Sequence, residues 1–387
     1  MKKVLVVSTR PPYPLHNGSA IRTFQAIRFL SRMSYDVDVV YLTTEHDNRA
    51  TDEGLAPYCR NIRWFKVSRL RSCLGVLWGL LTNRKPLQVN YYYFRSIERA
   101  IGRSASDYDL IFYNNIRSAE YLKHAPAMKV LDFVDAISMN YAKAESQKKG
   151  LWHYLYKIDH RRCLRYERGL LARMQKCMII SEIDRDYILY DGCSYDISVI
   201  ENYVKECNDT IRHEAGNYNI VFVGTMNYEP NISAVGYFVK EIFPAVQQRY
   251  PGAKFYIVGN KPTEEVRRLA SNAVVVTGFV EEVAAYLMRS AVVAVPMISG
   301  AGIQNKILEA MSMGGCVVTT PIGFEGLCRE EGAPFVASSA REMMDVISRL
   351  FDSADLRSSV GRQAKEYVRN HYSEEVLFSK FRDFIQQ

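Results

Sequence analysis

The segment SGAGIQNKILEAMSMGGCVVTT, residues 299–320, joins a glycine-containing turn to a helical pattern and then to a β-branched strand. With a helical repeat of about 100° per residue, Asn305, Glu309 and Ser312 share one polar stripe. Lys306 lies beside that stripe, and apolar side chains occupy the opposite face. Glycines before the helix leave its first N–H groups unpaired, so an anion can bind there. The segment predicts an α/β domain with a diphosphate site at the helix start and a ribose site at Glu309. An ordinary amphipathic helix with a surface Lys306–Glu309 pair is the alternative.

The composition indicates a folded protein in a reducing environment. The 387 residues suffice for two or three domains, and 48% hydrophobic with 24% charged residues excludes a disordered chain. No secretory signal precedes Val4, and the longest apolar run, LGVLWGLL at 74–81, is too short to cross a bilayer. The eight cysteines form no C-x-x-C pair, which is typical of reduced thiols in the cytoplasm. The net charge of +8 favours anionic partners such as nucleotides or phospholipids.

Short β-rich runs alternate with helical patterns along the chain. In the first half, buried strands are predicted at residues 4–8, 37–42, 110–113, 129–133 and 177–181. After a polar stretch at 205–217, a second series of strands begins with NIVFVG at 219–224. Such alternation is typical of parallel α/β sheets, whose ligands bind at the carboxyl ends of the strands. We therefore expect one domain at 1–204, a second at 205–365, and a helical segment at 366–387 that crosses back to the first domain.

Three longer segments carry a resemblance to a known family: STRPPYPLHNGSAIRT at 8–23, IVFVGTMNYEPNISAVGYF at 220–238 and GIQNKILEAMSMGGCVVTTPIGFEGL at 302–327. In order and spacing they resemble the retaining GT-B glycosyltransferases of the group 1, or family four, type. LDFVDAISMNYAKAE at 131–145 is similar to a subgroup tied to bacterial polysaccharide assembly. The resemblance implies an α/β fold with two facing Rossmann-like domains, parallel sheets and an interdomain cleft.

The resemblance also implies a reaction. A sugar moves from a nucleotide diphosphate sugar to a glycan or lipid-linked acceptor, with retention of anomeric configuration, in bacterial surface polysaccharide synthesis. No metal and no cofactor besides this donor substrate is expected, because Lys306 and the first N–H groups of its helix would neutralise the leaving diphosphate. The sequence has no D-x-D motif in a loop context, since Asp36-Val37-Asp38 enters a predicted strand.

Donor-binding residues follow from the same match. Glu309 resembles the ribose-binding second glutamate of the family's E-x7-E pattern, and Lys306 resembles its phosphate-binding lysine. Gly18 resembles the loop glycine that lets the backbone approach the diphosphate, and Gly278 begins a stretch that resembles the base-reading loop. The predicted donor site comprises Gly18, Gly278, Gly302, Ile303, Asn305, Lys306 and Glu309.

The sequence departs from the family pattern at two places. Ala301 stands where the first glutamate of E-x7-E would hold sugar hydroxyls, which leaves the donor sugar open. TMNYE at 225–229 stands where many members carry an arginine and a lysine. Either Lys306 and Asn305 bear more of the diphosphate, or activity is weak or lost.

Two aspartates near the end of a predicted strand are the candidate catalytic residues. Asp132 and Asp135 accompany the strand at 129–133, and residues at the carboxyl ends of such strands line the ligand site. The alternative is that an aspartate here caps the N-terminus of the next helix.

Two basic segments lie in the first domain. Arg60–Lys85 places Leu and Trp side chains at helical spacing among cations, and Lys148–Arg168 gathers a second group of cations. A basic amphipathic helix can lie in a membrane interface, so an anionic lipid surface and a peripheral position on the inner face of the membrane are predicted. The alternative is that the leucines pack on the sheet and the cations face solvent.

Two further functions are compatible with these features. A nucleotide-sugar epimerase of the same fold would turn over without an acceptor and would need acid and base carboxylates around the sugar. A non-catalytic nucleotide- or carbohydrate-binding protein would tolerate the replacements at Ala301 and at 225–229. No nucleic acid is expected as a partner, because no recognition module accompanies the positive charge.

Overall fold

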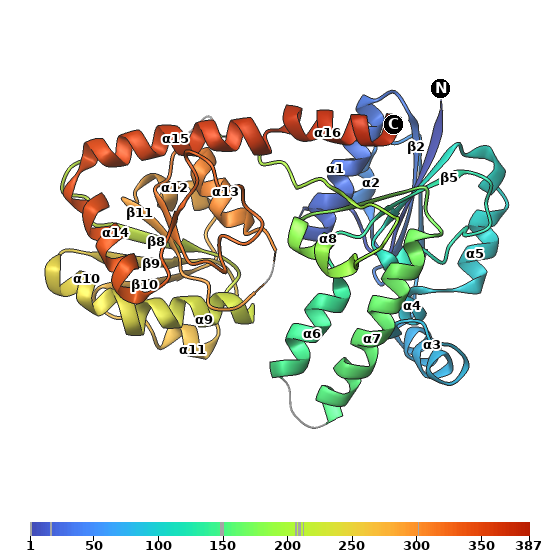
Figure 1. Ribbon diagram of the computed structural model, residues 1–387, viewed down its shortest axis with the longest axis horizontal. Coiled ribbons are helices and arrows are strands. Elements are labelled where there is room, and N and C mark those ends of the chain that lie inside the picture. The colour runs from blue at the N-terminus through green and yellow to red at the C-terminus, as the bar shows by residue number, and fades with distance from the viewer. Residues whose placement is uncertain are drawn as a thin grey trace. The chain divides into compact units, whose positions relative to one another are not determined.

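The computed structural model describes residues 2–15, 18–147, 151–205, 207, 210–211, 213–300 and 302–387. The chain divides into two compact units (Figure 1). Unit 1 comprises Met1–Asn202 together with Phe378–Gln387, and unit 2 comprises Tyr203–Leu377. Each unit is built around its own parallel β-sheet.

The sheet of unit 1 has seven parallel strands in the order β3-β2-β1-β4-β5-β6-β7. Valine, leucine and isoleucine dominate its central strands, which are covered on both faces and fully buried. The strand order reverses between β1 and β4, which makes that edge a topological switch point. The strands are β1 (Lys3–Ser8), β2 (Asp36–Thr43), β3 (Asn61–Lys66), β4 (Leu110–Asn114), β5 (Met128–Asp132), β6 (Lys176–Ile179) and β7 (Ser198–Val199).

Helices cover this sheet, and the last helix of the chain ends among them. Phe29 of α1 contacts Phe381 of α16 with ring centroids 5.5 Å apart, and Lys176 donates to the carbonyl of Phe384 at 2.5 Å. The helices of unit 1 are α1 (Gly18–Arg32), α2 (Arg49–Leu55), α3 (Arg69–Thr82), α4 (Leu87–Tyr92), α5 (Arg95–Gly102), α6 (Ile137–Gln147), α7 (Leu151–Leu171) and α8 (Glu182–Ile188), with 3-10 turns at Ala105–Asp107 and Ile116–Ser118. α16 (Glu374–Gln386) ends in unit 1.

The sheet of unit 2 has six parallel strands in the order β10-β9-β8-β11-β12-β13. Its order reverses between β8 and β11, so this unit has a switch point of its own. The strands are β8 (Asn219–Val223), β9 (Lys254–Val258), β10 (Val274–Gly278), β11 (Val292–Val295), β12 (Val317–Thr319) and β13 (Phe335–Val336).

The helices of unit 2 pack on both faces of that sheet around one apolar core, which includes Phe222, Phe238, Phe255 and Ile307. They are α9 (Glu229–Tyr237), a π-helical turn at Phe238–Ile242, α10 (Phe243–Arg249), α11 (Glu264–Arg267), α12 (Val283–Met288), α13 (Asn305–Ser312), α14 (Ala340–Asp352) and α15 (Ala354–Tyr372). The expected α/β class with two parallel sheets is confirmed.

The strand β3 was not anticipated from the sequence. Residues Asn61–Lys66 pair in parallel with β2 as an edge strand, and their side chains are only half-buried or exposed. Two cations in six residues, Arg63 and Lys66, mask the apolar pattern of this strand. Among the described residues, no helix is both long and apolar enough to cross a bilayer.

Candidate functional site

Glycines lie at the carboxyl ends of three neighbouring strands of unit 2, namely β8, β9 and β10. Gly259 follows β9 with a φ of +151°, and a Cβ there would lie 1.7 Å from the carbonyl oxygen of Gly224, which follows β8. Gly259 also donates to the carbonyl of Gly278 at the end of β10 at 3.2 Å. These contacts draw the three strand ends together, because only glycine permits so close a backbone approach. Backbone atoms therefore line the edge of the sheet next to the switch point between β8 and β11.

Lys306 forms contacts across that switch point. Its Nζ donates to Oδ1 of Asn231 at 2.5 Å and lies 4.7 Å from the centre of the Phe222 ring. Lys306 belongs to α13, which follows β11, whereas Asn231 belongs to α9, which follows β8. In open α/β sheets a ligand binds in the crevice where the connections diverge in this way. The ammonium thus lies where the topology places a ligand.

The ammonium of Lys306 has no anionic partner within ion-pair distance among the described residues. Its partners are the Asn231 amide oxygen, the Phe222 ring and, at 3.9 Å, the sulfur of Met297. Burial lowers the pKa of Lys306 to about 8, and the charge of Glu309 opposes that shift. A desolvated cation that lacks a counter-ion favours the arrival of an anion.

Glu309 lies one turn after Lys306 and is the solvent-accessible member of the pair. Surrounding protein atoms nevertheless desolvate its carboxylate and raise its pKa, whereas Lys306 lowers it. The predicted helix faces are confirmed for Ile307 and Ala310, which are buried. Ser312, expected on the polar stripe, is buried and donates to the carbonyl of Glu309 at 2.7 Å. The Ser312 hydroxyl forms its hydrogen bond within the last turn of α13. Glu309 is therefore the last residue of the exposed polar face.

The other predicted donor residues lie around the start of α13 or on neighbouring connections. Gly302 and Gly278 have positive φ values of +72° and +71°, and a Cβ on either would meet nothing within 4 Å. Ile303 packs partly on the core, and Asn305 begins α13. Gly18 begins α1 of unit 1, again with open space at its Cβ position. Ala301 lies outside the described residues.

In unit 1, the Asp132 carboxylate forms a buried ion pair with Arg22. Its Oδ2 accepts from Nε of Arg22 at 2.7 Å and its Oδ1 accepts from Nη2 at 3.3 Å, with side-chain exposures of 1% for Arg22 and 0% for Asp132. Nη1 of Arg22 also donates to Asn202 at 3.3 Å. These contacts join α1 to the end of β5 and to Asn202, three residues after β7. This placement gives Asp132 a positioning role in the sheet, and its catalytic role stays a prediction.

Asp135 lies three residues after the end of β5 and keeps some solvent exposure. Its Oδ2 accepts from Asn140 at 2.7 Å. Burial and then the charge of Asp184 raise the pKa of Asp135 to about 6, against the lowering effect of Arg117. Such a carboxyl group exchanges a proton near neutral pH, which suits an acid or base.

Arg117 follows β4 and provides positive charge at the same edge. Nε of Arg117 donates to Oε1 of Gln88 at 2.5 Å, and its guanidinium lies 5.6 Å from the Tyr92 ring centre. Burial lowers the pKa of Arg117, and the charge of Arg10 lowers it further. Arg10 follows β1, so two cations come from the two sides of the switch point.

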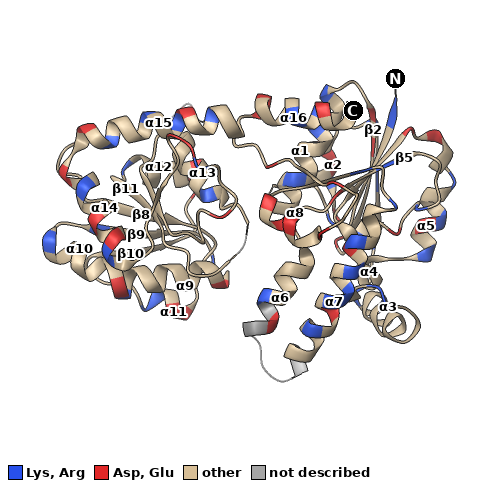
Figure 2. Cartoon of the chain, in the orientation of Figure 1, with Lys and Arg blue, Asp and Glu red and all other residues tan. Residues whose placement is uncertain are grey.

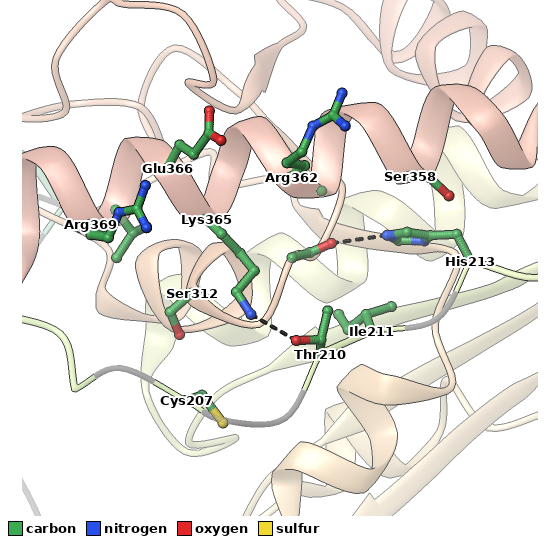
Figure 3. A pocket seen from close by; sticks show the side chains of 13 residues that line it. Cys207, Thr210, Ile211, His213, Ser312, Ser358, Arg362, Lys365, Glu366 and Arg369 are labelled. Carbon is green, nitrogen blue, oxygen red and sulfur yellow. Dashed lines mark hydrogen bonds between the residues drawn. The ribbon is translucent and has the colours of Figure 1, made fainter.

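A cavity lies elsewhere in unit 2. It holds about 560 Å³ between the C-terminal end of α13, α15 and residues 207, 210, 211 and 213 (Figure 3). There, Lys365 donates to Thr210 at 2.7 Å, and His213 lies 3.0 Å from the carbonyl oxygen of Gly314. Of its lining residues, Ser312 ends α13 and Gly314 follows that helix, so this part of the lining lies at the end of α13 opposite Lys306. The cavity therefore lies away from the carboxyl ends of the strands, and we do not place the donor in it.

The sequence prediction missed Asn231, Arg117 and Arg10. Asn231 is the informative case, because it is a buried amide between Pro230 and Ile232 at the start of an apolar helix. A polar side chain at a buried helix position is the signal that would have pointed to it.

The comparisons with known proteins agree with this geometry. Residues 217–353 match the family described as glycosyl transferases group 1. The match lies within unit 2. A Klebsiella pneumoniae protein described as an uncharacterized 44.6 kDa protein in the cps region is 22% identical over 404 residues, covering 98% of each chain.

Solved glycosyltransferases share the fold over the whole chain. Sucrose-phosphate synthase from Thermosynechococcus elongatus has a TM-score of 0.70 at 15% identity, covering 100% of this chain and 99% of that chain. TarM gives 0.73 at 12%, with the same coverage. Anabaena Alr3699/HepE, solved in complex with UDP and glucose, gives 0.66 at 15% and covers 100% of both chains. At these identities the likeness is one of fold, and that fold is GT-B.

Proposed function

We propose that this protein is a group 1 glycosyltransferase that transfers a sugar from a nucleotide diphosphate sugar, with retention and without a metal, to a glycan or lipid-linked acceptor. The observation that carries the proposal is the half-buried Lys306 ammonium at the switch point of unit 2, which lacks an anionic partner among the described residues. The UDP complexes of Alr3699/HepE, a protein of the same fold, support a nucleotide as donor. The cps-region relative supports bacterial surface polysaccharide as the context.

In this proposal the start of α13 receives the diphosphate. Backbone N–H groups at Gly302 and Ile303 and the Lys306 ammonium neutralise it, while Asn305 offers an amide beside them. Glu309 accepts hydrogen bonds from the ribose hydroxyls, and the backbone after Gly278 contacts the base. The positive charge of Lys306 would take the place of a divalent cation, because it meets the negative charge that develops on the leaving group.

The proposed step is a substitution at the anomeric carbon. The acceptor oxygen forms a bond to that carbon while the bond from the carbon to the β-phosphate oxygen breaks. The acceptor proton passes to a β-phosphate oxygen on the same sugar face, which gives retention and leaves a nucleoside diphosphate. Unit 1 would bind the acceptor, with Arg10 and Arg117 as cations and Asp135 as a hydrogen-bond partner.

The test is turnover with a panel of UDP-, GDP-, ADP- and TDP-sugars and lipid-linked oligosaccharides from an encapsulated bacterium. We expect one donor to release its nucleoside diphosphate only with acceptor, with activity kept in EDTA. Proton NMR of the product should show the anomeric configuration of the donor. Isomerised donor without acceptor would instead identify an epimerase, and nucleotide binding without any conversion would identify a non-catalytic protein.

A further inference from the structure

Helix α3 of unit 1 packs against the protein through its small residues and exposes its large apolar residues to solvent. Ser72 and Gly79 are its buried positions. The exposed apolar side chains recur at helical spacing on one face: Leu70 (78% exposed), Leu74 (64%), Leu77 (59%), Trp78 (70%) and Leu81 (85%). Scattered exposed leucines are ordinary on a soluble protein, but a continuous stripe marks an interaction surface.

Close packing holds this orientation. Gly75 and Gly79 lie against Asn90 of α4, where an added Cβ would come within 3.0 Å of the Asn90 carbonyl oxygen and 2.3 Å of its side-chain nitrogen. No larger side chain fits there without displacing α4. Rotation of α3 to bury its leucines would drive them into that space. The apolar stripe is therefore a fixed outer face.

A cationic pocket lies at the C-terminal end of α3. It encloses about 390 Å³ and is lined by Arg84, Lys157, Ile158, Arg161, Arg162 and Arg165. Nη1 of Arg162 is buried and has no hydrogen-bond partner among the residues that the structure describes. No carboxylate is among the lining residues. Figure 2 shows basic segments along α7, which supplies most of this lining.

We infer that α3 lies in the interface of an anionic lipid bilayer, with a phosphate-bearing lipid headgroup in the pocket formed by Arg84 and α7. Leu81 ends the apolar stripe three residues before Arg84, so the apolar face and the pocket adjoin. Leucine and tryptophan side chains would enter the acyl boundary while the arginines meet the headgroup phosphates. Guanidinium groups suit phosphate because their N–H groups bind its oxygens in pairs.

The positive charge around α3 favours an anionic bilayer over a second copy of this chain as the partner of the apolar stripe. Arg69 and Arg71 lie at the other end of α3, outside the pocket, and neither forms an ion pair among the described residues. Two copies meeting through α3 would bring these cations and those of the pocket together, whereas an anionic surface would neutralise them. The site extends the proposed function by naming its membrane contact. Its test needs no donor or acceptor, so the two proposals fail independently.

Flotation with vesicles tests the surface directly. The full-length protein is mixed with vesicles of phosphatidylcholine alone or with 30% phosphatidylglycerol, a composition of about one anionic lipid in three. We expect binding to the anionic vesicles, with lower affinity at high salt. A variant with Trp64→Phe and Trp152→Phe keeps Trp78 as its sole tryptophan, and its emission should shift to the blue on binding.

Two sets of variants separate the two parts of the site. Leu74→Ser, Trp78→Ser and Leu81→Ser together should abolish binding and leave the melting temperature unchanged, because these side chains are exposed. Arg161→Glu with Arg165→Glu should weaken binding to anionic vesicles at least about 30-fold. The matched control is Arg103→Glu, which reverses an exposed charge of unit 1 outside the pocket and should change binding only slightly.

Three results would overturn the inference. One is that the wild-type protein does not float with anionic vesicles. The second is that the serine variant binds as well as the wild type. The third is a dimer in size-exclusion chromatography that the serine substitutions dissociate while vesicle binding is absent, since that result assigns the stripe to self-association.

Discussion

Lys306 on α13 donates a 2.5 Å hydrogen bond to Asn231 on α9, joining the helices that follow the two strands at the switch point of unit 2. The bond holds the ammonium in place without neutralising it, because its acceptor is a neutral amide. A preorganised but uncompensated cation is what a diphosphate site requires. The predictions on binding start from this contact.

Lys306→Met should weaken binding of the donor nucleotide about 10- to 150-fold, since a hydrogen bond to a charged group contributes about 1.5–3 kcal/mol. The methionine keeps most of the buried stem, and the melting temperature should not fall. Isothermal titration calorimetry with the nucleotide from the donor panel measures the change. Lys254→Met, at the opposite edge of the sheet, is the control and should bind like the wild type. Equal affinity in all three proteins would remove Lys306 from the site.

Nucleotide affinity should fall as the pH rises past about 8. Burial lowers the pKa of Lys306 to that value, so the unbound protein loses the ammonium there while a bound diphosphate would hold the proton. The same shift makes its contribution to the free energy of unfolding rise between about pH 8 and pH 10.5, because the unfolded state then binds more protons than the folded state. Calorimetric titrations at pH 7, 8 and 9 test the binding part. Affinity that does not change in this range would contradict it.

The parallel α/β pattern could be predicted because it depends on local signals. Buried strands such as Val4–Ser8 carry continuous β-branched runs, and α1, α7 and α14 carry helical periodicity. The placement of Lys306 and Glu309 on one helix could be predicted for the same reason, whereas their roles stay predictions. The partners of these residues are not local, and no spacing in the sequence reveals that Lys306 meets Asn231, 75 positions away.

The same limit applies to Asp132. Its position at a strand end is a local feature that a catalytic aspartate and a structural one share. What separates them is Arg22, 110 residues earlier, which burial brings against both carboxylate oxygens. Similarly, only the tertiary packing shows that α3 exposes its leucines. Helical spacing predicts that the leucines share one face of the helix, but it does not predict whether that face points to the core or to solvent.

Asp132→Asn should destabilise the protein by about 3–5 kcal/mol, because it leaves the Arg22 guanidinium buried without its counter-ion. Urea denaturation of the two proteins measures the difference. Arg22→Met combined with Asp132→Leu should recover part of the loss, since it removes both charges. Asp47→Asn, which breaks the exposed pair with Arg49, is the control and should have no measurable effect. A stable Asp132→Asn protein that lacks activity would instead support a catalytic role.

Gly259→Ala should be among the most destabilising single substitutions in unit 2, at about 3 kcal/mol or more. The new Cβ would lie 1.7 Å from the Gly224 carbonyl oxygen, and the φ of +151° is strained for any L side chain. Strands β8 and β9 would have to separate at their carboxyl ends. Thermal denaturation should therefore show a lowered melting temperature together with weaker nucleotide binding. Gly236→Ala, in α9 with open space around it, should be neutral or stabilising.

The free energy of unfolding should fall as the pH rises from about 4.5 to 7. Glu167 is fully buried, accepts from the backbone N–H of Ser138 at 3.2 Å and from the Ser138 hydroxyl, and burial raises its pKa to about 7. The folded state therefore binds a proton that the unfolded state releases in this range, so unfolding becomes easier by up to about 3 kcal/mol.

Glu167→Gln should reduce that slope, because the amide stays neutral at every pH. Urea denaturation at pH 5, 6 and 7 compares the variant with the wild type and with Glu182→Gln, whose exposed parent side chain makes it the control. Asp135, whose pKa burial raises to about 6, should keep part of the slope in the variant. If Glu167→Gln and the wild type lose stability in parallel up to pH 7, Glu167 is already ionised at pH 5. In that case the Ser138 hydrogen bonds outweigh the cost of burial.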